Sequence, residues 1–220
     1  MKKKTLIIVE SPTKIKTLKK ILRGNFIFAS SIGHIRDLPK KGLGIDIEHD
    51  FEPDYQILPD KKEVISELKK SAKAADVVYL APDPDREGEA IAWHIAQILP
   101  KKTPIQRITF HSITKDAILE ALQQPREIDQ SLVNAQQARR LLDRLVGYKI
   151  SPLLQRRVHK GRDGIVSAGR VQSVALLLVV EREQAINAFI PVEYWNVYAD
   201  LIAKNVGFTA TVVNLSLIHI

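Results

Sequence analysis

Short apolar segments alternate with helix-like segments through the first half of the chain. Strands are predicted where apolar, often β-branched residues run together, and helices where apolar residues recur every three or four positions. The predicted strands are 5–9, 26–31, 77–81 and 105–110, and the predicted helices are 12–24, 62–75, 87–99 and 114–122. Alternation of this kind predicts an α/β fold with a mainly parallel sheet covered by helices. Residues 33–60, rich in Gly, Pro and Asp, interrupt the pattern and are predicted to form a long loop.

The pattern changes after about residue 125. A long helix is predicted over 131–150, ending near Gly147, and a mostly apolar helix over 170–186. A basic, glycine-containing loop is expected at 160–169, and strands are expected at 194–203 and 208–215. The chain is therefore predicted to contain three parts: an α/β domain (1–125), a mainly helical domain (126–188) and the start of a β-rich domain (189–220).

Basic charge is concentrated in the predicted helical part. The net charge is +8, and residues 134–191 carry ten Lys or Arg against four acidic residues. A localised basic excess suggests an anionic partner such as nucleic acid, although a solvated basic surface would have the same composition. The absence of cysteine excludes disulfides and cysteine-bound zinc and agrees with a cytoplasmic protein. No apolar run approaches the ~20 residues of a membrane span.

Acidic residues gather where two of the predicted strands end. Glu10 follows the strand 5–9, and Asp83 follows the strand 77–81. Both therefore lie at the same edge of a parallel sheet if the two strands are neighbours. Asp83, Asp85 and Glu87 recur at every second position, so an extended stretch would point them to one side. Oxygen ligands without His or Cys suit Mg²⁺.

Two basic residues accompany these acids. Arg86 is placed to meet a phosphate oxygen, and Lys14 in "VESPTK" offers a phosphate-neutralising group beside Glu10, a candidate general acid–base. A simpler interpretation is that the acids only cap the following helix and favour its N-terminus. In that interpretation Lys14 is an ordinary surface residue.

Five stretches in series resemble one family. They are "IIVESPTKIKT", "SSIGHIRDLP", "APDPDREGEAIAWHI", "NAQQARRLLDRLVGYKISPLL" and "SAGRVQSVALLLVVERE". Together they are similar to the N-terminal part of the bacterial DNA topoisomerase I family, the type IA topoisomerases, over residues 4 to 200. The resemblance implies a Rossmann-like Toprim domain, a helical DNA-binding domain and the start of a β-rich arch domain. "DPDRE" alone would not separate this family from primases and some nucleases.

The resemblance implies a reaction and a catalytic set. A tyrosine attacks a DNA phosphodiester, forms a 5′-phosphotyrosyl link, and the break is resealed after strand passage without ATP. Glu10, Asp83 and Asp85 would hold Mg²⁺, with Glu87 completing the acidic set. Glu10 would also move a proton at the leaving 3′-oxygen, and Lys14 would stabilise charge on the scissile phosphate.

The resemblance also implies a set of DNA contacts. Arginines suit phosphates and a tyrosine can stack on a base, but residues on the long helix could equally be only its solvated face. Gln155 stands where the family often has tryptophan, and the segment before "SAGR" is a few residues longer than usual. The implied contacts are His34, Arg139, Arg140, Asp143, Tyr148, Gln155, Ser167, Ala168, Gly169, Arg170, Val171 and Gln172.

The implied nucleophile is not found among the five tyrosines. The family's tyrosine lies in a "YxRT"-like motif, and none of Tyr55, Tyr79, Tyr148, Tyr194 and Tyr198 has that context. The chain is therefore expected to bind Mg²⁺ and DNA, single-stranded or negatively supercoiled, without cleaving it. It is further expected to be a monomer without membrane contact, in the bacterial cytoplasm with the nucleoid. Residues 216–220 are interpreted as a tail that need not be native. The alternatives are another Toprim enzyme, a primase or metal-dependent nuclease, and a DNA-binding module without catalysis.

Overall fold

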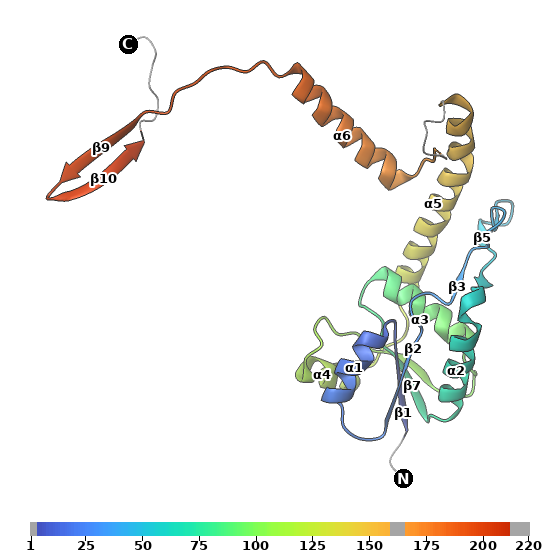
Figure 1. Cartoon of the computed structure of the whole chain (residues 1–220). Helices are drawn as coiled ribbons and strands as arrows, with labels where there is room; N and C mark the ends of the chain where they lie inside the picture. Colours follow the sequence, from blue (N-terminus) through green and yellow to red (C-terminus); the bar gives the residue numbers. More distant parts are fainter. Residues whose placement is uncertain (1–3, 159–165, 212–220) are drawn as a thin grey trace. The chain divides into compact units, whose positions relative to one another are not determined.

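Four short strands form one parallel sheet in the order β2–β1–β7–β8 (Figure 1). They are β1 (Thr5–Val9), β2 (Phe26–Ser30), β7 (Val77–Leu80) and β8 (Ile105–Arg107). The computed structural model describes residues 4–158 and 166–211. In the register of the sheet, Thr5 pairs with both Phe26 and Val77, so β1 lies between β2 and β7. The strands that precede Glu10 and Asp83 are therefore neighbours, which is the condition for both acids to lie at the same edge of the sheet.

Helices cover both faces of this sheet. Alternate residues of β1 point to opposite faces, so Leu6 and Ile8 belong to one apolar cluster and Ile7 and Val9 to another. The first cluster is completed by α2 (Lys62–Lys73) and α3 (Arg86–Ile98), and the second by α1 (Pro12–Ile21) and α4 (Lys115–Gln123). The predicted α/β class with a parallel sheet is thus confirmed.

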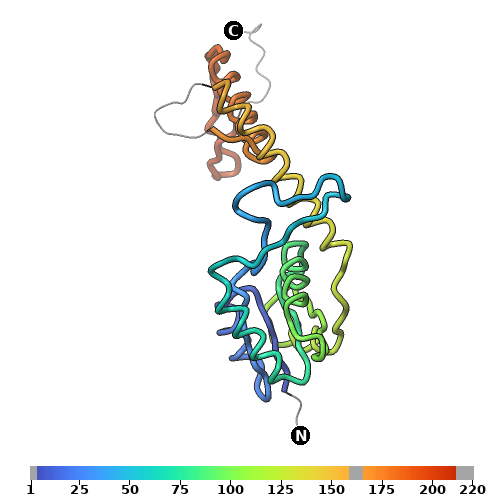
Figure 2. Tube along the Cα trace, turned by 90° about the vertical axis from the view of Figure 1, so that its right-hand side faces the viewer, coloured from blue at the N-terminus to red at the C-terminus, as the bar shows by residue number. Residues whose placement is uncertain are grey.

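The segment 33–60 is more ordered than predicted. It contains two small antiparallel ladders, β3 (Arg36–Asp37) with β6 (Gln56–Ile57) and β4 (Ile45–Asp46) with β5 (Glu52–Pro53), before a short helical turn at Pro59–Lys61. Two-residue strands carry no readable alternation, which is why the pattern predicted a loop. Figures 1 and 2 show this segment beside the first half of α5 (Gln130–Arg157), and side-chain contacts described below connect them.

The long helix was predicted to end near Gly147, and this was wrong. α5 continues to Arg157, through both Gly147 and Pro152. Proline removes one intrahelical hydrogen bond and glycine costs roughly 1 kcal/mol in a helix interior. Neither residue ends α5, and the helix continues on both sides of each. The helix begins at Gln130, after the N-cap residue Asp129, whose side chain accepts from the N–H groups of Ser131 and Leu132.

The chain divides into two compact units, Met1–Arg170 and Val171–Ile220. The second unit holds α6 (Arg170–Ala188), apart from its first residue, and a hairpin of β9 (Tyr198–Ala203) and β10 (Val206–Thr211). Lys204 and Asn205 both have positive φ at the turn, as a tight two-residue hairpin requires. The predicted strand ends beyond 211, most of the 160–169 loop and the tail 216–220 lie outside the described residues.

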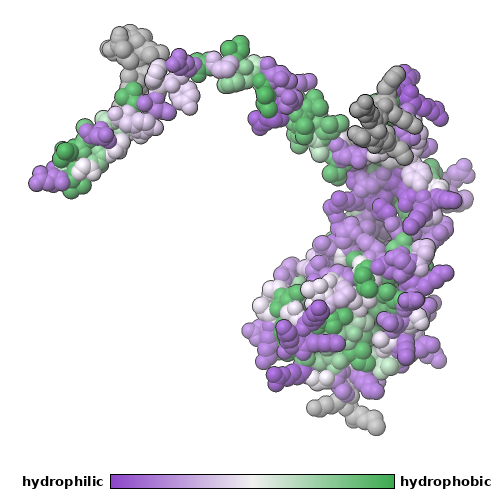
Figure 3. All heavy atoms as spheres, in the orientation of Figure 1, coloured by the Kyte–Doolittle hydropathy of each residue, from purple (hydrophilic) through white to green (hydrophobic). Residues whose placement is uncertain are grey.

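Large apolar side chains of α6 are exposed, among them Leu176, Leu177 and Leu178, and Figure 3 shows apolar surface along this helix.

No helix within residues 4–158 and 166–211 is long and apolar enough to cross a membrane. The predicted domain limits at 125 and 188 stay a prediction.

Candidate active site and nucleic-acid interface

Two of the predicted acids, Glu10 and Asp83, meet Lys14 at the carboxyl edge of the sheet. Glu10 follows β1 directly, and Asp83 lies in the loop after β7. The ammonium of Lys14 contacts Glu10 Oε1 and lies 2.5 Å from Asp83 Oδ1, so two carboxylates share one positive charge. Burial lowers the pKa of Lys14, but hydrogen bonds to Asp83 and Glu10 outweigh burial and raise the pKa above its ordinary value.

Asp85 begins α3. Its Oδ1 accepts a 2.7 Å hydrogen bond from the Gly88 N–H, so it is the N-cap of the helix. Because helical geometry starts at Arg86, the prediction that Asp83, Asp85 and Glu87 alternate along an extended stretch was wrong. Arg86 is exposed at the first helical position, and Glu87 lies in the first turn.

The residues at this edge fit a small divalent cation. Within the described residues, no three His, Cys, Asp or Glu side chains are already gathered as ligands. At this edge, Glu10 and Asp83 both contact the ammonium of Lys14. Glu10 Oε2 is buried and has no hydrogen-bond partner, which leaves one hard oxygen donor unsatisfied.

His34 and Glu87 lie beside these acids. His34 Nε2 is 3.1 Å from Glu87 Oε2, and the Gln136 amide of α5 donates to the same oxygen at 3.2 Å. A turn at Ile32 and Gly33 presents His34, and the Gly33 N–H donates to the Glu10 carbonyl at 2.8 Å. Ile32 has a φ of 53°, a left-handed conformation that is unfavourable for a β-branched residue.

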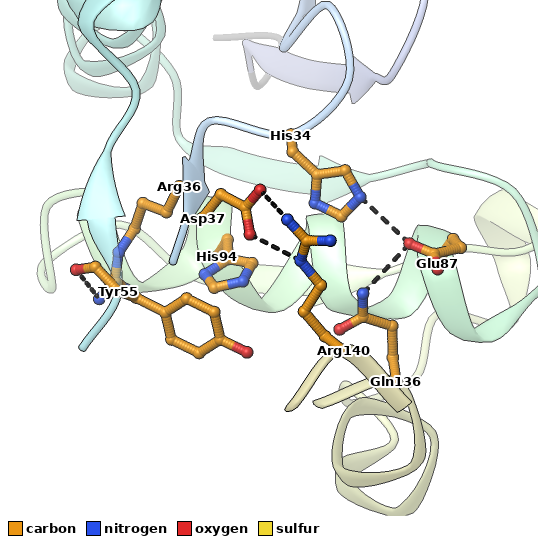
Figure 4. Close-up of a pocket in the computed structure, with 8 residues that line it drawn as sticks. All are labelled: His34, Arg36, Asp37, Tyr55, Glu87, His94, Gln136 and Arg140. Carbon is orange, nitrogen blue, oxygen red and sulfur yellow. Dashed lines mark hydrogen bonds and ion pairs between the residues drawn. The ribbon is translucent and has the colours of Figure 1, made fainter. Parts of the chain in front are cut away.

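A pocket of about 250 Å³ opens next to Glu87 (Figure 4). Across it, Arg140 of α5 forms a bidentate ion pair with Asp37, with Nε–Oδ1 at 2.9 Å and Nη2–Oδ2 at 2.5 Å. This hydrogen bonding raises the pKa of Arg140. The pocket is lined by His34, Arg36, Asp37, Tyr55, Glu87, His94, Gln136 and Arg140.

The remaining predicted contacts on α5 also have protein partners. Asp143 Oδ1 lies 2.6 Å from Arg170 Nε, and Arg139 is more loosely placed, 3.9 Å from Asp143 Oδ2. The Tyr148 hydroxyl donates to the Lys40 carbonyl at 3.3 Å and accepts from Arg144 at 3.1 Å. The structure thus brings Arg139, Asp143 and Arg170 together.

The segment before α6 runs back along α5. The Ala168 N–H donates to Ser151 Oγ at 3.0 Å, and Gln155 Nε2 donates to the Val166 carbonyl at 3.2 Å. A Cβ on Gly147 would lie 3.9 Å from the Ala168 carbonyl, an ordinary contact. Ser167 and Gly169 continue this segment within the first unit, whereas Val171 and Gln172 belong to the second.

Sequence reasoning missed several residues around the site. Asp37 and Arg144 connect α5 with the segment 36–39, and Gln136 connects it with Glu87 of α3. Glu89 and Arg107 form a fully buried ion pair below the acidic edge. Only Arg107 gave a signal in the sequence, as the single charged residue of the strand-like segment "IQRITF", whereas Glu89 follows other acids at the start of a helix.

A parallel α/β sheet with acids at its carboxyl edge is the arrangement expected of a Toprim-type domain, and comparison with known proteins agrees. The Toprim domain model matches residues 5–113, and a DNA topoisomerase model matches residues 127–215. Full-length topoisomerase I from Thermotoga maritima is similar in structure, with 47% identity and a TM-score of 0.75 over 88% of this chain. The match spans 32% of that protein's length.

The chain belongs to the bacterial type IA DNA topoisomerase family.

Proposed function

We propose that the acidic edge binds Mg²⁺ through Glu10, Asp83 and Asp85, beside a DNA strand bound along α5. The observation that carries the proposal is the Lys14 ammonium held between Glu10 and Asp83, with Glu10 Oε2 buried and unpaired. A site that binds one cation between two carboxylates, and in which Glu10 Oε2 has no partner, suits a hard divalent ion. The ion, when bound, would neutralise charge on a DNA phosphate.

The chain's own residues would then act on the phosphate and the leaving oxygen. Glu10, only 17% exposed at its side chain, is placed to hold or return a proton. Lys14, released from Asp83, would neutralise the scissile phosphate, and Arg86 at the start of α3 would meet another phosphate oxygen. Glu87, bonded to His34 and Gln136, would keep His34 oriented toward the bound strand.

DNA binding would follow α5 and the segment before α6. Among the proposed contact arginines, Arg139 has only a loose partner, 3.9 Å away, whereas Arg140 and Arg170 would exchange Asp37 and Asp143 for a phosphate. Tyr148 is 42% exposed and offers a ring for base stacking. The proposed contacts also include His34, Gln155 and residues 167–172.

In the whole protein, these groups would serve ATP-independent relaxation of negatively supercoiled DNA through a 5′-phosphotyrosine. None of the five tyrosines has the expected "YxRT" context. We therefore propose that this chain binds single-stranded DNA without cleaving it, and that it does so as a monomer. Its cellular setting would be the cytoplasm, with the nucleoid.

The test is incubation of the chain with end-labelled single-stranded DNA and Mg²⁺, followed by native and denaturing gels. The proposal predicts a shifted band on the native gel and unmodified DNA on the denaturing gel. A covalent protein–DNA adduct would contradict the claim that the chain cannot cleave. Mg²⁺-dependent nicking that Asp83→Ala abolishes would favour a nuclease instead.

A further inference from the structure

A buried ion pair lies directly below the acidic loop. Glu89 of α3 and Arg107 at the end of β8 are both fully buried, and Arg107 Nε donates to Glu89 Oε2 at 3.0 Å. Burial of charge is costly unless every group is paired and hydrogen-bonded. The bonds that this pair makes therefore indicate what it holds in place.

Arg107 holds the main chain on both sides of Asp83. Its Nη1 donates to the carbonyls of Leu80 at 3.0 Å and Pro82 at 2.9 Å, and its Nη2 donates to the carbonyl of Asp83 at 2.7 Å. The Pro82 and Asp83 carbonyls belong to the two peptide groups that flank the Asp83 Cα. One guanidinium thus fixes the orientation of both.

Gly88 lies against the other side of the Asp83 carbonyl. A Cβ on Gly88 would lie only 2.1 Å from the Asp83 oxygen, so the loop packs against the bare Cα of α3. The Asp83 carbonyl is therefore confined between Arg107 Nη2 and Gly88. This leaves little freedom for the main chain that carries the Asp83 carboxylate.

Glu89 in turn fixes Arg107 and the start of α5. Its Oε1 accepts from Arg126 Nη1 and from the Asp129 N–H, and its Oε2 accepts from Arg126 Nη2, each at 2.8 Å. Asp129 is the N-cap residue of α5, the helix that carries Gln136, Arg139 and Arg140. One carboxylate therefore connects the acidic loop with the first turn of the proposed DNA-binding helix.

We propose that Glu89 is a positioning residue: through Arg107 it fixes Asp83 for Mg²⁺, and through Arg126 and Asp129 it fixes α5 relative to that loop. Glu89 itself, fully buried, touches neither ion nor DNA. The inference rests on the proposed Mg²⁺ function of the acidic edge and deepens it.

The test compares Glu89→Gln with a control that is destabilised elsewhere. Glu89→Gln keeps the size and one carbonyl acceptor of the side chain but removes its charge. Leu68→Ala, in the apolar cluster under α2, lowers stability without touching the network. Both are titrated with MgCl₂ by calorimetry, at a temperature where each is folded by circular dichroism.

Mg²⁺ affinity should fall tenfold or more in Glu89→Gln and stay within twofold of wild type in Leu68→Ala, because groups that orient ligands typically contribute 10–100-fold to metal affinity. Equal affinities in the two variants would overturn the inference. If Glu89→Gln does not fold, Arg126→Gln replaces it, since that partly exposed side chain supplies two of the bonds to Glu89. A loss of at least threefold is then expected, and an unchanged affinity overturns the inference.

A second readout separates this inference from the proposed function. If Asp83→Asn leaves Mg²⁺ binding unchanged, the metal proposal fails, and amide exchange of Gly88 decides the inference alone. The Gly88 N–H is bonded to Asp85 Oδ1, so its exchange should be at least tenfold faster in Glu89→Gln than in Leu68→Ala of matched stability. Equal exchange rates would mean that Glu89 does not hold the loop.

Discussion

At the scale of single residues, Lys14 and Mg²⁺ are expected to compete for the same carboxylates. The ammonium contacts Glu10 and Asp83, so its removal leaves two negative groups close together without a partner. Lys14→Met should therefore bind Mg²⁺ several-fold more tightly, measured by calorimetry. Lys16→Met, which removes an exposed lysine of the same helix, should bind as wild type does. Weaker binding by Lys14→Met would show that Lys14 supports the ion rather than competing with it.

His94 gives a pH dependence of stability at the same scale. Burial lowers its pKa from 6.5 to about 3, and the ring is enclosed by Tyr55 and Trp93. The unfolded chain binds the proton first as pH falls, so the contribution of neutral His94 is complete above pH 6.5 and is lost toward pH 3. The loss is roughly 1.4 kcal/mol per pH unit.

Chemical denaturation between pH 7 and pH 4 measures this effect. His94→Phe should flatten the acid limb of the unfolding free energy. His111→Phe, at an exposed histidine, should leave the limb as in wild type. An unchanged acid limb in His94→Phe would mean that the ring is already solvated in the folded chain.

At the scale of elements, two helical glycines should respond in opposite ways to alanine. In α3, a Cβ on Gly88 would meet the Asp83 carbonyl at 2.1 Å, so Gly88→Ala must displace the acidic loop. In α5, a Cβ on Gly147 meets nothing closer than 3.9 Å. Gly147→Ala should raise the free energy of unfolding by up to about 1 kcal/mol, and Gly88→Ala should lower it by about 2 kcal/mol or more.

Thermal denaturation of the two alanine variants checks the pair, and Mg²⁺ titration adds a second readout. Only Gly88→Ala should lose Mg²⁺ affinity. A Gly88→Ala variant as stable as wild type would show that the loop does not pack on α3 as described.

Elements with a strong pattern were predictable, and those held by tertiary contacts were not. β1 and β7 read as apolar runs with acids at their ends, so the meeting of Glu10 and Asp83 followed from the rules of parallel sheets. The end of α5 did not, because Gly147 and Pro152 carry stop signals that the surrounding helix overrides. In the segment 33–60, Asp37 of β3 and the Pro39 carbonyl bind Arg140 and Arg144, which are far away in sequence.

Within the site, the sequence predicted that Glu10 and Asp83 lie close together, but not which partner each site residue binds. Asp85 was predicted as a metal ligand, and its role as N-cap depends on where α3 starts. Glu89 was indistinguishable from an acid that favours a helix N-terminus, because its partners Arg107 and Arg126 are 18 and 37 positions away. Such partners become visible only when the fold brings them together.

At the scale of the whole molecule, the basic excess of residues 134–191 predicts salt-dependent DNA binding. Each phosphate contact on a single strand contributes about 0.7 to the slope of log affinity against log salt concentration. Replacement of both Arg139 and Arg140 by Ala should lower that slope by about 1.4, measured by fluorescence anisotropy with an oligonucleotide. Lys69→Ala, at an exposed position on α2, should leave the slope unchanged. An unchanged slope in the double variant would remove both arginines from the interface.

The most direct test of the central claim is calorimetric titration of MgCl₂ into the wild-type chain and into Asp83→Ala/Asp85→Ala. An acidic edge that holds the ion predicts one saturable site in wild type, weakened at least tenfold in the variant. Asp85→Asn, which can still cap α3, separates lost binding from a lost helix start. Equal Mg²⁺ affinity in wild type and in the double variant would contradict the claim and leave these acids as caps and ion-pair partners alone.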